Sequence, residues 1–96
     1  MIAVLAKIPV KPGSEADFER AMLALAEQVR ANEPGNHLYT LCRDADGGYT
    51  MMELYADEAA IAAHRDSEHF KAGGASLAPH LAGAPEITTM QVVDQT

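Results

Sequence analysis

Two ionisable side chains stand out because each lies among apolar residues. Glu53 is flanked by Met51, Met52 and Leu54, and a carboxylate in such a setting is costly unless it is paired or hydrogen-bonded. Partial burial would raise its pKa, and a raised pKa suits a group that transfers protons. Exposure on a strand and a structural salt bridge are the alternative explanations, because perturbed carboxylates mark functional sites only as a tendency.

The second side chain is His64, which follows Ala60 and Ile61 by four and three residues. A helix over this stretch would place the imidazole on the same face as those apolar side chains. The imidazole could then be a general base, a proton donor or an oxyanion stabiliser, or a core histidine satisfied by one hydrogen bond. If the helix lies over the sheet, Glu53 and His64 could meet, and the carboxylate would fix the imidazole tautomer.

Four further side chains are candidates for the wall of a pocket. His69 and Phe70 follow a predicted helix break and could border a cavity, or they could be a cap region and one core aromatic. Tyr39 and Tyr55 bring hydroxyl groups to the predicted sheet, although amphipathic tyrosines often only anchor an interface.

Several other chemistries lack their sequence signature. His64 and His69 are five residues apart and therefore do not have the i, i+4 spacing of a helical zinc pair. Cys42 is the single cysteine, so no cysteine cluster exists for zinc or iron–sulfur ligation. Gly47-Gly48 and Gly73-Gly74 lack the context and the lysine of a phosphate-binding loop. We expect neither a bound metal nor a cofactor.

Length and composition indicate one domain spanning residues 1–96. The net charge of -7, without a basic cluster, argues against nucleic acid or an anionic membrane as a partner. A single cysteine fits a reducing compartment. The apolar residues 1–10 are too short for a membrane span and lack a basic leader, so we expect a cytoplasmic protein.

The elements that must position these side chains follow from periodicity and turn signals. Strands are predicted at residues 2–10, 37–43, 49–55 and 86–93. Because the turn at residues 44–48 is short, the second and third strands should form an antiparallel hairpin.

A first helix should begin at Ser14, which with Asp17 resembles a capping box, and should stop near Asn32 because Pro34 follows. Its apolar stripe consists of Phe18, Met22, Leu25 and Val29.

The second helical region should begin at Asp57, with residues 59–64 inside the helix. Ser67 can cap a further turn that is interrupted at Gly73-Gly74, and a short irregular helical piece should surround Pro79.

The resulting order, β-α-β-β-α-β, predicts an α+β ferredoxin-like fold with a four-stranded antiparallel sheet and helices on one face. The first and third strands are apolar on both faces: Leu5 points away from Val4, and Met51 away from Met52. Because helices can cover only one face, we expect a homodimer in which a second sheet covers the other.

The ordered motifs resemble the antibiotic biosynthesis monooxygenase superfamily over residues 2–93. The residues that carry the resemblance are Pro12-Gly13, Glu33-Pro34-Gly35, Tyr39, residues 53–58, His64, Ser67, His69 and Phe70. The resemblance implies the same fold and a dimeric α+β barrel. Members include cofactor-independent monooxygenases that oxidise phenols or hydroquinones to quinones, haem-degrading proteins and an isomerase of a small phosphorylated sugar derivative.

Glu53 and His64 occupy recurrent positions of this family pattern, but two departures narrow the function. Tyr55 stands where the family often has Trp, and the chain has no Trp at all. Lys7 stands where the haem-degrading branch would need Asn, which argues against haem degradation. The Glu-x-Tyr variant also resembles the isomerase branch.

The leading hypothesis is therefore a cofactor-independent oxygenase that uses dioxygen to oxidise a small electron-rich aromatic. His64 would deprotonate a phenolic hydroxyl and Glu53 would orient the imidazole. In this hypothesis, Tyr55 and His69 are pocket walls or hydrogen-bond donors, and Phe70 and Tyr39 are further substrate-binding candidates. The alternatives are an isomerase that uses the same pair on a hydroxyketone, and a non-catalytic dimeric module that binds a small molecule.

Overall fold

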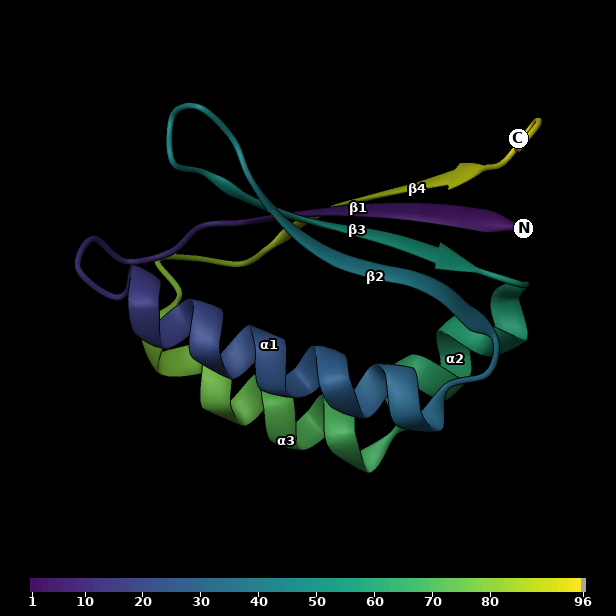
Figure 1. Ribbon diagram of the computed structural model, residues 1–96, viewed down its shortest axis with the longest axis horizontal. Coiled ribbons are helices and arrows are strands. Elements are labelled where there is room, and N and C mark those ends of the chain that lie inside the picture. Colours follow the sequence, from purple (N-terminus) through teal and green to yellow (C-terminus); the bar gives the residue numbers. More distant parts are fainter. Residues whose placement is uncertain (96) are drawn as a thin grey trace.

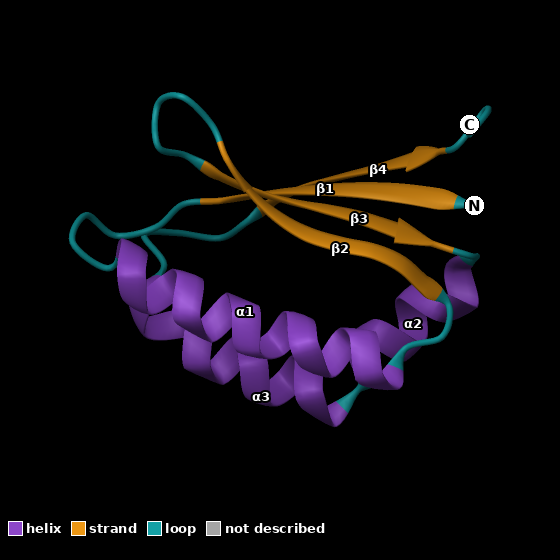
Figure 2. Ribbon diagram, in the orientation of Figure 1, coloured by secondary structure: helices purple, strands orange, loops and turns teal. Residues whose placement is uncertain are grey.

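The computed structural model describes residues 1–95 and contains one antiparallel sheet. Its strands are β1 (Ile2–Ile8), β2 (Asn36–Arg43), β3 (Tyr49–Tyr55) and β4 (Glu86–Gln91), in the order β2-β3-β1-β4. All helices lie on one face of the sheet (Figures 1 and 2). The expected β-α-β-β-α-β order and ferredoxin-like fold are confirmed, with the second helical region divided into α2, α3 and η1.

The first and last strands of the chain, β1 and β4, end earlier than the sequence pattern predicts. β1 stops at Ile8 because Pro9 has no N–H with which to continue the ladder, and Val10 makes only an isolated bridge with Leu81. β4 ends at Gln91 rather than at residue 93.

The first helix, α1 (Glu15–Asn32), buries the predicted apolar stripe against the sheet. Ser14 is its N-cap residue but makes no side-chain capping bond; the nearby N–H of Gly13 donates to Glu15 instead. The capping-box prediction is therefore wrong in its hydrogen bonds, although the start of the helix is right. The helix ends at Asn32, and Glu33 is its C-cap residue.

The helices α2 (Glu58–Asp66) and α3 (Glu68–Leu77) meet at Ser67. The carboxylate of Asp57 accepts a hydrogen bond from the N–H of Ala60 and begins α2. The hydroxyl oxygen of Ser67 accepts from the N–H of Phe70 and begins α3, while Ser67 also ends α2. Both capping predictions are confirmed, and the extended backbone of Ser67 turns the chain between the two helices.

The predicted break at Gly73-Gly74 is wrong, because α3 continues through both glycines to Leu77 and the 3₁₀ helix η1 (Ala78–His80) follows. A Cβ atom on Gly73 would lie 2.8 Å from Cδ1 of Leu25. The glycine therefore allows α1 and α3 to pack closely, and the two helices run side by side beneath the sheet (Figure 1).

The two faces of the sheet differ in what covers them. The side chains of Ile2, Val4, Ala6 and Ile8 point toward the helices and are buried. The cross-strand register places an apolar set on the opposite face, which no helix covers: Ala3, Leu5, Leu38, Met52, Leu54 and Met90. Within residues 1–95, no helix combines the length and the apolar character needed to cross a bilayer.

Candidate functional site

A cavity of about 210 Å³ lies between the helices and the sheet. Most of its lining residues are apolar, and they include Val4 of β1, Met22 of α1 and Leu77 of α3. The polar and charged lining residues are Tyr39, Glu53, Tyr55, His64 and Arg65. Ile87 of β4 also lines the cavity and is 50% exposed, so the cavity opens beside this edge strand.

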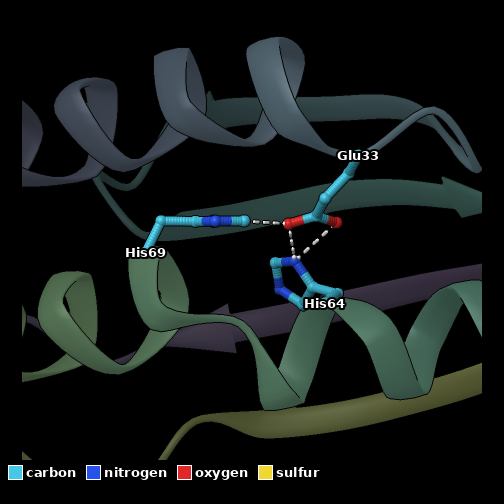
Figure 3. Close-up of side chains that lie close together, drawn as sticks. All are labelled: Glu33, His64 and His69. Carbon is cyan, nitrogen blue, oxygen red and sulfur yellow. Dashed lines mark hydrogen bonds and ion pairs between the residues drawn. The ribbon is translucent and has the colours of Figure 1, made fainter.

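His64 is held by the carboxylate of Glu33. Its Nδ1 atom lies 2.9 Å from Oε2 and 3.0 Å from Oε1 of Glu33. Figure 3 marks both contacts with dashed lines. Their side chains are only 5% and 6% exposed. Hydrogen bonds to a charged group are stronger than those between neutral groups, and burial protects this one from water. The pair thus fixes the imidazole of α2 to the C-terminal end of α1.

Glu33 also accepts hydrogen bonds from Nε2 of His69 and from Nδ2 of Asn36, the latter at 3.2 Å. Burial alone would raise the pKa of Glu33. The hydrogen bonds from His69, His64 and Asn36 outweigh that effect and lower the pKa below its ordinary value. The residue is therefore an anion at neutral pH, held by donors from three segments of the chain.

This arrangement sets the tautomer of His64. An ionised carboxylate only accepts hydrogen bonds, so Nδ1 of His64 must carry the hydrogen. In the neutral imidazole, Nε2 then has a free lone pair. Nε2 makes no hydrogen bond to any described residue, and His64 lines the cavity. The ring is thus prepared to accept a proton at Nε2.

Three aromatic rings surround this imidazole. The ring centroid of Phe70 lies 4.6 Å from that of His64, and those of Tyr39 and Tyr55 lie at 5.2 and 5.6 Å. All three aromatic residues also line the cavity. They limit the movement of the imidazole and give its surroundings an apolar character.

Glu53, which we expected to orient His64, has a different partner. Its Oε1 accepts a hydrogen bond of 2.5 Å from the hydroxyl of Tyr55, while the carboxylate at Nδ1 of His64 is Glu33. Burial raises the pKa of Glu53, although the Tyr55 hydrogen bond and the charges of His64 and Arg65 oppose that effect. Burial likewise raises the pKa values of Tyr55 and Tyr39.

The structure brings five of the six predicted site residues to one cavity: Tyr39, Glu53, Tyr55, His64 and Phe70. His69 is not among the lining residues and contacts Glu33 instead. Sequence reasoning named Glu33 as part of a family motif before the second strand but did not predict it as a site residue. One signal was available, because a carboxylate at the negative end of a helix dipole is unfavourable unless positive groups or donors compensate it.

Glu33, His64 and His69 also offer a set of metal ligands. One ligand atom from each of Glu33, His64 and His69 lies within 4.8 Å of the other two. The spacing rule did not anticipate this cluster, because it assumed that both histidines belong to one continuous helix. The turn at Ser67 places them on separate helices.

Comparison with known proteins identifies the class of protein that this fold and site define. Residues 1–75 match the sequence model of the family described as antibiotic biosynthesis monooxygenase, and the chain belongs to that family. A Bacillus subtilis (strain 168) protein named "Putative monooxygenase YcnE" is 33% identical over 87 residues, which cover 88% of this chain and 90% of that protein.

Solved structures with the same fold include two that align with almost the whole chain. A Caulobacter crescentus CB15 structure titled "putative antibiotic biosynthesis monooxygenase" is 42% identical, has a TM-score of 0.93 and aligns over 97% of this chain and 90% of its own. Rv0793 from Mycobacterium tuberculosis is 25% identical, has a TM-score of 0.88 and aligns over 98% of this chain and 96% of its own.

Proposed function

We propose that this chain is a cofactor-independent monooxygenase that oxidises a small, electron-rich aromatic of the hydroquinone type. The observation that carries the proposal is the imidazole of His64, whose Nδ1 is fixed by the buried Glu33 and whose ring lines the cavity. Membership of a monooxygenase family supports the reaction class. Glu33 replaces Glu53 as the residue that orients the base.

The chemistry needs a base, dioxygen and a confined substrate. A phenolic hydroxyl gives its proton to Nε2 of His64, and the phenolate passes one electron to dioxygen. The two radicals join at a ring carbon as a peroxide, and the imidazolium returns the proton to the terminal oxygen. Loss of water then leaves a new carbonyl, so a hydroquinone and dioxygen become a hydroxyquinone and water. Proton transfer and placement are the contributions of the protein.

The cavity suits such a substrate in size and polarity. A volume of about 210 Å³ accommodates a single aromatic ring with small substituents and is below the range typical of sites for drug-sized ligands. Apolar walls exclude water from the reactive radical pair. In this proposal the hydroxyl of Tyr55, held by Glu53, marks the polar end that orients the substrate.

Oxygen consumption tests the proposal. Purified, metal-free protein would be assayed against hydroquinones and polyphenols, beside His64→Ala and the control variant His37→Gln, which alters an exposed histidine of β2. We expect uptake that depends on the protein, survives in the control and falls strongly in His64→Ala. Undiminished uptake in His64→Ala would remove this histidine from the mechanism.

An isomerase is the second candidate, and the combination of Glu53 and His64 in one cavity favours it. The raised pKa of Glu53 suits a proton donor, and His64 in the same cavity suits a base, which together could move a proton between the carbons of a hydroxyketone. This reaction consumes no oxygen. Product formation under anaerobic conditions separates it from the monooxygenase.

We also infer that two chains pair through the uncovered face of the sheet. Met52, Met90 and Leu38 on that face are 42%, 41% and 39% exposed, which is unusual for large apolar side chains grouped on one surface. A second copy of the chain would cover the same residues by isologous pairing. Light scattering at micromolar concentration tests this, and a monomeric mass would exclude it.

A further inference from the structure

The cluster of Glu33, His64 and His69 contains more contacts than the orientation of His64 requires. A single contact to Glu33 is sufficient to fix the tautomer of His64, yet a second imidazole also reaches the same carboxylate. The three side chains come from the end of α1, from α2 and from α3, and they point at one another (Figure 3). Two imidazoles and one carboxylate are a common ligand set for divalent transition metals.

The geometry is close to that of a metal site. Four ligands at the usual zinc distance of about 2.1 Å are roughly 3.4 Å apart in a tetrahedron. Here Nδ1 of His64 lies 2.9 Å from Oε2 of Glu33, and all three ligand atoms lie within 4.8 Å of one another. Side-chain adjustments of about 1 Å would therefore admit an ion.

The burial of the three side chains and their access from the surface are also those expected of a metal site. The side chains of Glu33 and His64 are almost fully buried, whereas that of His69 is 14% exposed. His69 lines a shallow groove between α1 and α3 together with Gln28 and Glu68. An ion and a water ligand could enter from this groove without passing through the substrate cavity, and the net charge of -7 favours cations near the surface.

We propose that Glu33, His64 and His69 form a binding site for a divalent transition metal of the zinc class, and that the metal inhibits the proposed base. A neutral imidazole has one lone pair. If Nδ1 of His64 binds a metal, Nδ1 loses its hydrogen, and the neutral imidazole carries its one hydrogen on Nε2 instead, so Nε2 cannot accept a proton from the substrate. The inhibitory part rests on the proposed function; the binding site does not.

The test uses ZnCl₂ and CoCl₂ as probes on protein prepared in chelator. Calorimetry measures zinc affinity and stoichiometry, and the visible bands of Co²⁺ report its coordination. The control variant His37→Gln/His80→Gln/Cys42→Ala removes the other histidines and the thiol. Glu33→Gln and His69→Gln each remove one proposed ligand. Circular dichroism in chelator establishes that each variant is folded.

We expect one zinc ion per chain in the wild type and the control, with affinity at least about tenfold weaker in Glu33→Gln and His69→Gln. Equal affinity in folded Glu33→Gln and the control, or no binding to the wild type, would overturn the site. Oxygen uptake that persists under saturating zinc would overturn the inhibition. Zinc binding without uptake on any substrate would leave the site supported and the proposed function contradicted.

Discussion

Oε2 of Glu33 lies 2.9 Å from Nδ1 of His64, although the two residues are 31 positions apart in the chain. Glu33 is held at the end of α1, and His64 is the buried residue of α2. Gly35 makes this approach close, because a Cβ atom there would lie 2.8 Å from Cβ of Ala60 on α2. The contact therefore couples the orientation of the proposed base to the packing of two helices.

Replacing Glu33 by Gln should disturb the orientation of the His64 imidazole without disturbing the binding of the substrate. The amide has nearly the same shape, but it lacks the negative charge that stabilises the imidazolium, and it can present an N–H to Nδ1. An amide N–H that donates to Nδ1 favours the imidazole tautomer with its hydrogen on Nε2, which cannot act as the base. The substitution should therefore lower kcat by about 100-fold or more, by analogy with carboxylate-to-amide changes beside catalytic histidines. KM should change little. Steady-state oxygen uptake measures both, and a proportional change in KM alone would contradict the orienting role.

The raised pKa of Glu53 predicts how stability depends on pH. Because the folded-state pKa lies above the unfolded value, the folded protein holds the proton more tightly. The contribution of Glu53 to the stability of the folded protein should therefore increase as the pH falls through the folded pKa and decrease as the pH rises. Glu53→Gln should have the higher Tm at pH 7, and the difference should disappear near pH 4.

Thermal melts of both proteins between pH 8 and pH 4 provide the measurement. Glu27→Gln, on the exposed surface of α1, is the matched control and should follow the wild type. A Tm difference for Glu53→Gln that stays constant across this range would exclude titration of Glu53 as its cause.

Gly73 and Gly74 form a matched pair for testing helix packing. Ala at position 73 would meet Leu25 of α1, whereas a Cβ on Gly74 has no atom within 4 Å. Gly73→Ala should therefore destabilise the fold by about 1–3 kcal/mol through overpacking. Gly74→Ala should stabilise it by about 0.5–1 kcal/mol because Ala favours a helix. Urea denaturation compares them, and equal effects would refute close packing at Gly73.

Met52→Lys tests the proposed dimer face. The lysine places a charge at the centre of the apolar set on the uncovered sheet face, next to Leu5 on β1. We expect a shift from dimer to monomer in light scattering at the same protein concentration. Leu23→Lys changes a side chain of α1 that is 53% exposed, and it should leave the mass unchanged. Dissociation by both variants would point to a general loss of structure instead.

The fold could be predicted because each element carries its own local signal. The stripe through Phe18 and Val29 gave α1, and Asp57 and Ser67 marked the starts of α2 and α3. Gly73 was misinterpreted because its reason lies in a tertiary contact with Leu25, and such contacts override local propensity.

The site could be predicted only in part for the same reason. The apolar face of α2 identified His64, and strand patterning identified Glu53. The position of the helices over the sheet decides whether Glu33 or Glu53 reaches the imidazole. The periodicity of the sequence does not predict that position. The sequence pattern did not assign Glu33 to the site, because the two imidazoles that it contacts are more than thirty residues away.

The cluster depends on the number of residues between His64 and His69, because the turn at Ser67 lies between them. Each residue of a helix rotates its side chain by about 100°, so one inserted residue after Ser67 would carry His69 to a different side of α3. Glu33 would then retain one imidazole and lose the other. Substitutions around Ser67 can be absorbed by the neighbouring helices, but an insertion or deletion in this link would divide the cluster.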